Sequence, residues 1–163
     1  MAYYSTEERV IPQLIADSST TQYHPLGTII RARDDTYGGG EFIYLLGVAS
    51  TAVGSLVTFH PSTYQTALAP VGTNKPQPIA VAMSANGAAA YGWYQIAGTA
   101  VVKKTSAVSL ASGVAVGVKT IGLPASTGTG KEIQGALTAA AGASGAASIL
   151  ISINRPHMQG RIT

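Results

Sequence analysis

The feature that most constrains the fold of this chain is a series of short apolar runs separated by turn residues. Six runs rich in β-branched and aromatic residues follow one another between residues 26 and 118, with clusters of Gly, Pro, Asn and Ser between them. Turns that recur every eight to twelve residues or so are typical of β-sandwiches and β-barrels, not of βαβ units. The runs lie at 26–33, 41–48, 55–60, 78–84, 91–98 and 99–104.

The stretch from Phe42 to Leu46 is apolar at every position, which predicts a strand buried on both faces. We expect one face to meet the core of this domain, and the other to meet a second sheet or another subunit. Three glycines, Gly38–Gly40, come just before it. They predict either a mobile connection or a place where two backbones approach closely.

The last third of the chain changes in composition. Residues 119–146 are rich in Gly, Ala, Ser and Thr, and predict extended loops with one short strand at 131–137. A clear strand at 148–154 then follows, and a late strand of this kind commonly closes a sheet. The sequence thus predicts a compact all-β domain at 26–155, an antiparallel β-barrel or β-sandwich with Gly/Ala-rich loops and a C-terminal tail at 156–163.

Residues 1–25 predict an extended N-terminal arm. A poorly ordered terminus is the alternative, but the segment holds more large apolar and aromatic side chains than a solvated tail needs. We therefore expect an arm that docks on another protein. The predicted contact residues are Tyr3, Tyr4, Val10, Ile11, Leu14 and Ile15.

The aromatic residues near position 93 predict a subunit interface. Tyr91 and Trp93 would share one face of a strand, and Tyr94 would lie on the other. Core packing explains one face, whereas aromatic side chains on both faces favour contact with a partner. Together with the apolar strand, the interface candidates are Phe42, Tyr44, Leu46, Tyr91, Trp93 and Tyr94.

Charge is sparse and unevenly placed. Charged residues make up 10% of the chain against about 25% in ordinary soluble domains, which suits a protein packed against others. The net charge is +3, yet residues 1–41 are acidic on balance and the remainder is basic. The cations of the remainder are scattered, without an Arg-rich run, so we expect no nucleic-acid partner. The uneven charge favours an arrangement in which the acidic residues 1–41 face the basic remainder or a basic neighbouring protein.

No pattern predicts catalysis or a cofactor. The stretch 126–132 resembles a phosphate-binding loop but has Ala125 in place of its first glycine and Glu132 in place of Ser or Thr after the lysine. His24, His60 and His157 lack metal-ligand spacing. The acids at 34, 35 and 41 could suggest a glycosidase pair, although Asp-Asp before Thr-Tyr-Gly is ordinary turn chemistry. We expect a protein that is not an enzyme.

The cellular compartment is predicted from features that the sequence lacks. There is no cysteine, so no disulfide can hold the fold. No basic segment followed by an apolar one stands at the start, and no apolar stretch approaches the ~18 residues of a membrane span. We therefore expect synthesis in a cytoplasm and no membrane association.

Two stretches, QYHPLGTIIRARDDTYGGGEFIYLLGVASTAVGSLVTF at 22–59 and PIAVAMSANGAAAYGWYQIAGTAVV at 78–102, resemble the small decoration or cement proteins of tailed-bacteriophage heads. The segment SILISINRP at 148–156 fits the closing strand of that family. The resemblance implies an all-β domain, usually a homotrimer, whose extended termini reach across the major capsid protein subunits on the outer surface of the virion. It implies no catalytic machinery. A head-fibre or receptor-binding module that recognises a host surface is the alternative.

Overall fold

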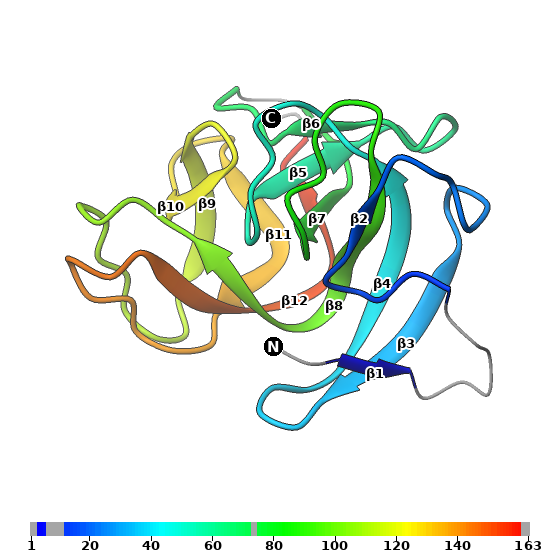
Figure 1. Cartoon of the computed structure of the whole chain (residues 1–163). Helices are drawn as coiled ribbons and strands as arrows, with labels where there is room; N and C mark the ends of the chain where they lie inside the picture. The colour runs from blue at the N-terminus through cyan, green and yellow to red at the C-terminus, as the bar shows by residue number, and fades with distance from the viewer. Residues whose placement is uncertain (1–2, 6–11, 73–74, 161–163) are drawn as a thin grey trace.

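The computed structural model describes residues 3–5, 12–72 and 75–160, and within these ranges all regular secondary structure is β, as predicted (Figure 1). Twelve strands form one curled antiparallel sheet. The strands are β1 (Tyr3–Ser5), β2 (Ser18–Ser19), β3 (Ile29–Asp34), β4 (Gly38–Leu46), β5 (Leu56–Phe59), β6 (Thr66–Leu68), β7 (Ile79–Ala82), β8 (Tyr91–Lys103), β9 (Ala115–Thr120), β10 (Leu123–Ser126), β11 (Glu132–Thr138) and β12 (Ser148–Met158).

The sheet has a main path and a side branch. The main path runs β1-β3-β4-β8-β12-β11-β9-β10, and the branch β7-β5-β6 leaves it at β8. The branch curls back on β4, where Leu46 forms a bridge with Gln65 just before β6. Strands β4, β8, β7, β5 and β6 therefore surround a small core, while β9 to β12 form the other side of the molecule (Figure 1).

The long strand β8 belongs to both sides. Its first half pairs with β4, and its second half, from Ala97 to Lys103, pairs with β12. Gly98 lies between the two halves with φ of 102°, and a side chain there would collide with the carbonyl oxygen of Gly39. Two separate runs, 91–98 and 99–104, were expected from the sequence, and the structure joins them because glycine lets one strand bend without ending.

Buried side chains form three clusters. The first, the aromatic cluster, lies on the outer face of β4 and β8 and contains Ile15, Ile30, Ala32, Phe42, Tyr44, Met83 and Trp93. The second fills the small core, with Ile43, Leu45, Val57, Ala80, Ala82, Tyr94 and Ile96. The third and largest, the aliphatic cluster, lies between β5 and β7 on one side and β8, β9, β11 and β12 on the other; its members include Leu56, Val81, Val102, Val118, Ile133 and Ile151.

Strand β4 is buried on both faces, as its sequence predicts. Phe42 and Tyr44 enter the aromatic cluster, whereas Ile43 and Leu45 enter the small core on the opposite face. From the sequence alone, either a second sheet or another subunit could have covered the face that carries Phe42 and Tyr44. Within the described residues the cover comes from this chain itself, because Ile15 from the N-terminal segment packs there.

The three glycines belong to β4 and do not form a loose connection. Gly38–Gly40 pair with Ala32–Asp34 of β3, and a Cβ atom on Gly40 would lie 3.0 Å from the carbonyl oxygen of Ala97 in β8. Of the two expectations for this stretch, close backbone approach is therefore confirmed.

The Gly/Ala-rich region holds more regular structure than its composition predicts. A hairpin of β9, which begins before this region at Ala115, and β10 was not expected, whereas β11 was expected within one residue at each end. Strand β12 continues past the predicted end at 154, and its residues Pro156 and Met158 are buried. The start of the predicted tail is thus part of the sheet.

Candidate functional site

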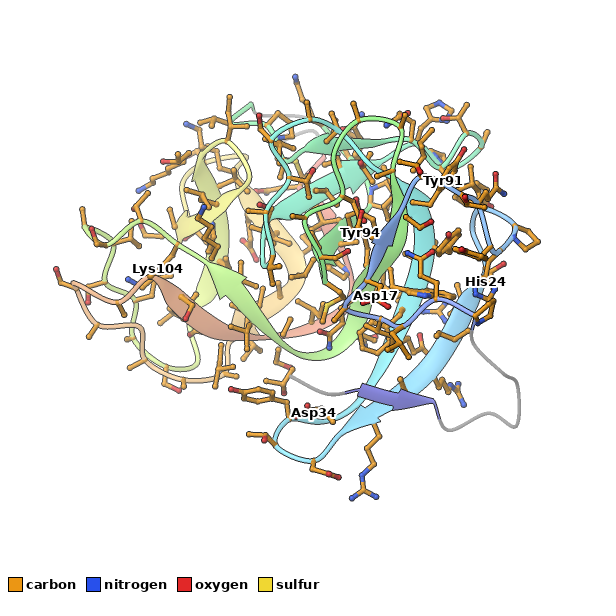
Figure 2. The ribbon with its side chains drawn as sticks, viewed as in Figure 1. Asp17, His24, Asp34, Tyr91, Tyr94 and Lys104 are labelled. Carbon is orange, nitrogen blue, oxygen red and sulfur yellow. The ribbon has the colours of Figure 1, made fainter. Side chains whose placement is uncertain are left out.

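Residues 12–19 form what we call the docked segment: Gln13 and Ile15 lie against Tyr44 and Trp93 on the outer face of β4 and β8, and Ser18–Ser19 pair with Tyr91 and Gly92 of β8 (Figure 2). Gln13 is buried and holds the segment in place: its Nε2 donates to the carbonyl oxygen of Tyr91 at 2.9 Å, and its Oε1 accepts from the Tyr44 hydroxyl at 2.6 Å. The indole nitrogen of Trp93 donates to the carbonyl oxygen of Gln13 at 3.1 Å. The buried polar atoms of two aromatic residues are satisfied by one glutamine.

The six predicted arm residues have different fates. Tyr3 and Tyr4 lie in β1, whose backbone pairs with Arg33 and Asp34 of β3. Val10 and Ile11 lie outside the described residues. Ile15 is buried at 3% exposure, whereas Leu14 beside it is 64% exposed. Of Leu14 and Ile15, Leu14 is therefore the side chain that another protein could contact.

The six predicted interface residues lie mostly inside the chain. Phe42, Tyr44, Trp93 and Tyr94 are fully buried at 0% exposure and present no surface to a second copy. Leu46 and Tyr91 keep partial exposure. The expectation that all six face a partner does not hold for the first four, because residues 12–26 and the β5–β7 branch of the same chain cover both faces of their strands.

His24 completes the aromatic cluster from the edge. Its ring lies 5.2 Å from that of Tyr44 and 5.0 Å from that of Trp93. Burial lowers the pKa of His24 and raises the pKa of Tyr44, because desolvation disfavours the charged form of each. Burial also raises the pKa of Tyr94 in the small core. Burial of the three rings is therefore the main cause of these pKa shifts.

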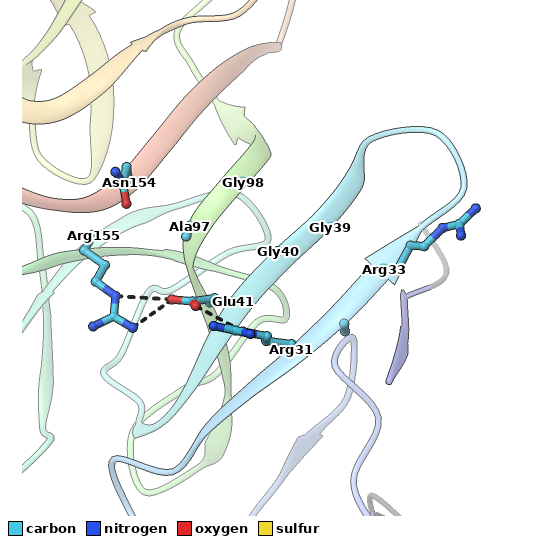
Figure 3. A pocket seen from close by; sticks show the side chains of 10 residues that line it. Arg31, Arg33, Gly39, Gly40, Glu41, Ala97, Gly98, Asn154 and Arg155 are labelled. Atoms are coloured by element: carbon cyan, nitrogen blue, oxygen red, sulfur yellow. Dashed lines mark hydrogen bonds and ion pairs between the residues drawn. The ribbon is translucent and has the colours of Figure 1, made fainter. Parts of the chain in front are cut away.

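A groove crosses the exposed face of the sheet where β3, β4, β8 and β12 lie side by side (Figure 3). Its volume is about 440 Å³, and we call it the arginine groove. Glu41 of β4 accepts from Arg31 of β3 at 3.3 Å and from Arg155 of β12 at 3.2 and 3.0 Å. Its lining includes Arg31, Gly39, Glu41, Gly98, Asn154 and Arg155.

The two arginines of the groove stabilise the ionised form of Glu41. The hydrogen bond from Arg155, followed by that from Arg31, lowers the pKa of Glu41 despite its partial burial. The side chain of Glu41 is 19% exposed, but those of Arg31 and Arg155 are 73% and 64% exposed. Two guanidinium groups with open outer surfaces therefore flank one covered carboxylate. The sequence had offered Glu41 only as one acid of a discounted glycosidase pair, and its grouping with Arg31 and Arg155 was not predicted, because Arg155 and Glu41 are 114 positions apart.

The other acidic and basic motifs have local roles. The carboxylate of Asp34 accepts from the backbone nitrogens of Thr36 and Tyr37 at 2.8 and 2.9 Å, which is the turn chemistry expected of it. In the stretch that resembles a phosphate loop, Ser126 accepts a hydrogen bond from Lys119 at 2.7 Å. Among the described residues there is no group of three or more His, Asp or Glu side chains that could hold a metal ion.

One lysine is buried at the opposite side of the molecule. Lys104 follows β8, and its ammonium donates to the carbonyl oxygens of Val108, Ala143 and Ala146 at 2.8, 2.9 and 2.7 Å. It thereby joins the loop after β8 to the loop between β11 and β12.

Comparison with known proteins adds no relative: no protein-family model matches the chain, and no curated protein matches it significantly. Within residues 3–5, 12–72 and 75–160, no helix has the length and apolarity needed to cross a bilayer.

Proposed function

We propose that this chain is a decoration or cement protein of a tailed-bacteriophage head. It binds the outer surface of the assembled capsid and stabilises joints between major capsid protein subunits. The observation that carries the proposal is the layout of the N-terminal region on an all-β body. Leu14 and Tyr23 are 64% and 50% exposed, while Gln13 between β8 and Tyr44 anchors the segment by buried hydrogen bonds.

This arrangement suits recognition of a preformed surface. The docked segment is fixed by Gln13 and Ile15, so Leu14 is presented without a large cost in lost backbone freedom on binding. Strand β1 extends the same N-terminal region along the edge of β3. Apolar side chains held on an anchored segment are preorganised for a partner, and the low charge of the chain gives little repulsion against a packed neighbour.

The proposed mechanism is thermodynamic linkage. A protein that binds where several subunits meet adds its binding free energy to the assembled shell and not to loose subunits. At a free concentration one hundred times Kd, this amounts to about 2.7 kcal/mol per site. Repeated over a capsid, the sum opposes the outward pressure of packaged DNA.

The proposal includes self-association as a homotrimer, for which Leu46 and Tyr91 are the remaining interface candidates because both keep partial exposure. Light scattering or native mass spectrometry measures the mass in solution and again after release from capsids. A mass of one chain in both conditions would contradict the trimer.

Cosedimentation with purified heads of the phage that encodes the chain tests the function. Wild-type protein should pellet with expanded heads and not with free capsid subunits. Leu14→Ser should weaken this binding, whereas Ile121→Ser, at a similarly exposed residue between β9 and β10, serves as the matched control. Binding to host cells without binding to heads would contradict decoration and favour the receptor-binding alternative.

A further inference from the structure

A polar hollow lies in the docked segment, next to the exposed side chain of Leu14. Its volume is about 370 Å³, and we call it the Asp17 cup. The backbone nitrogen of Asp17 donates to the carbonyl oxygen of Leu14 at 3.0 Å, so both residues belong to one turn and to one surface of the molecule. The lining of the cup includes Gln13, Asp17, Ser18, Ser19 and Tyr23.

The carboxylate of Asp17 is an exposed acid without a partner of its own. Within residues 3–5, 12–72 and 75–160, neither a hydrogen bond nor an ion pair reaches it. Two other acids of the chain are used differently: Glu41 binds two arginines, and Asp34 accepts two backbone hydrogen bonds in its turn. Asp17 therefore keeps its full capacity as an acceptor for a ligand.

The backbone on which this carboxylate stands is firmly held. The carbonyl oxygen of Asp17 accepts from Nε2 of Gln13 at 3.0 Å and from Oγ of Ser84 at 3.1 Å, and both donors belong to buried residues. The next two residues, Ser18 and Ser19, pair with β8 (Figure 2). A ligand that binds the carboxylate consequently does not have to order the chain that carries it.

Tyr23 adds an aromatic wall to the Asp17 cup. It is 50% exposed, and its backbone nitrogen donates to the Tyr44 hydroxyl at 3.3 Å, which fixes it beside the aromatic cluster. A guanidinium group stacks on aromatic rings and pairs with a carboxylate through two parallel hydrogen bonds. The cup thus offers the two kinds of contact that an arginine side chain makes best.

Other ligand chemistries fit the Asp17 cup less well. An anion would be repelled by the carboxylate of Asp17. A metal ion needs more than one such ligand, and the described part of the chain contains no group of three His, Asp or Glu side chains that could hold one. A cation on a planar organic group is the remaining choice, and it agrees with the acidic balance of residues 1–41.

We propose that the Asp17 cup binds an arginine side chain of a capsid subunit. The guanidinium pairs with the Asp17 carboxylate and stacks on Tyr23, while an apolar residue next to that arginine packs on Leu14. This inference rests on the function proposed above and names the chemistry of the surface that the docked segment recognises.

Binding of short peptides to the purified full chain tests the cup without capsids. The probe is the N-acetylated amide Leu-Arg-Leu, and its control is Leu-citrulline-Leu, in which a neutral urea of the same shape replaces the guanidinium. Amide NMR shifts should locate the probe at Asp17, Ser18 and Ser19, and the arginine peptide should bind at least about fivefold more tightly than the control. Equal binding of the two peptides, or shifts confined to other segments, would overturn the proposal.

Two variants with matched controls separate the carboxylate from the ring. Asp17→Asn should lower the affinity for the arginine peptide at least about fivefold and abolish the preference over citrulline, whereas Asp35→Asn, at an exposed acid in the turn after β3, should change neither. Tyr23→Leu should cost about threefold, and Tyr37→Leu in the same turn as Asp35 is its control. Losses as large in the controls as in the cup variants would contradict the assignment.

The chain itself carries one basic residue before the docked segment, Arg9, which lies outside the described residues. The variant Arg9→Gln tests it as a rival occupant and should bind the arginine peptide as the wild-type protein does. A clear gain in affinity would show that Arg9 fills the cup, and a capsid ligand would then be ruled out.

The head cosedimentation assay separates failure of the cup from failure of the proposed function. At limiting protein concentration Asp17→Asn should pellet with heads several-fold less than Asp35→Asn. If Asp17→Asn and the wild-type protein bind heads equally well, decoration stands and the cup is not the capsid contact. If the wild-type protein selects the arginine peptide but does not bind heads, the specificity of the cup stands and the proposed function fails.

Discussion

The two halves of strand β8 are packed in different ways. The first half, with Trp93, contributes to the aromatic cluster, where polar atoms are buried together with the rings and the docked segment satisfies them. The second half, with Ala100 and Val102, enters a cluster of aliphatic side chains that have no polar atoms. There the polar contacts lie outside the cluster, at Lys104, which ties two loops together through their carbonyl oxygens.

This difference in buried polar atoms determines what kind of segment can cover each half of β8. A buried indole or phenol costs free energy unless its polar atom finds a partner, so the aromatic half requires a particular residue, Gln13, at a particular place. An aliphatic surface makes no such demand and accepts any cover of suitable shape. The loops over the aliphatic half are rich in Gly and Ala, and a buried ammonium fixes their positions instead.

Removal of the docked segment should have the largest effect. Deleting residues 1–20 removes Ile15 from the aromatic cluster and leaves Trp93 and Tyr44 without their Gln13 partners. The free energy of unfolding should fall by about 4 kcal/mol or more, from the lost burial and the orphaned polar atoms together. Urea denaturation measures the change. Deleting only residues 1–11, which removes β1 but keeps Gln13 and Ile15, is the control and should cost less than deleting residues 1–20; equal losses would show that the docked segment does not stabilise the aromatic cluster.

The substitution Lys104→Met should have the second-largest effect on the free energy of unfolding. The substitution removes the ammonium that the carbonyl oxygens of Val108, Ala143 and Ala146 share as a donor, and it should lower the free energy of unfolding by about 2–4 kcal/mol. Hydrogen exchange should speed up in the loops at 105–110 and 139–147 and stay unchanged in β4. The neighbouring Lys103→Met, at an exposed side chain, should have little effect. If the two variants behave alike, the ammonium does not hold the loops.

Glu41 connects the two packed regions. It lies in β4, which contributes to the aromatic cluster, and it binds Arg155 of β12, which contributes to the aliphatic cluster. Glu41→Gln should lower stability by about 1 kcal/mol or less, the range of partly exposed ion pairs. The pKa of Glu41 is lowered in the folded state, so its contribution is full above the usual 4.5 and is lost as the pH falls through the lowered value. The stability difference between the wild-type protein and the Glu41→Gln variant should therefore vanish in acid, and a constant difference down to low pH would contradict the ion-pair explanation.

Protonation of His24 should have the smallest effect on the free energy of unfolding. Its pKa is lowered in the folded state, so the unfolded chain binds a proton more readily once the pH falls below about 6.5. Stability should be unaffected at higher pH and should fall with the pH until the lowered pKa is reached. The fluorescence of Trp93, next to His24, should report this change first in the aromatic half. In His24→Gln this acid sensitivity should be absent, and its persistence would assign the effect to another group.

The sequence predicted a large part of the fold. The runs at 41–48, 55–60 and 78–84 appear as β4, β5 and β7, and burial of Phe42–Leu46 on both faces was expected from its apolar pattern. Prediction was weakest at residues 115–126, where the hairpin of β9 and β10 was not expected although Val114, Val116 and Val118 alternate with small residues. Its strands are stabilised by pairing with β11 and by packing of Val116 and Val118, which are contacts distant in the sequence.

The candidate sites were less predictable than the fold. Aromatic residues on both faces of a strand indicate that both faces are covered, but they do not say by which chain. The arginine groove was not predicted, because Arg31, Glu41 and Arg155 come from three strands and have no shared spacing.

The sequence by itself determined which residues are buried and which strands they form, because alternation and apolar runs act through the local backbone geometry of a strand. Only the tertiary structure decided what buries them. Gln13 meets Trp93 across 80 positions, and Lys104 meets Ala146 across 42. Such contacts depend on how the sheet curls, and the curl is set by bends at residues such as Gly98 acting together over all the strands, which no short stretch encodes.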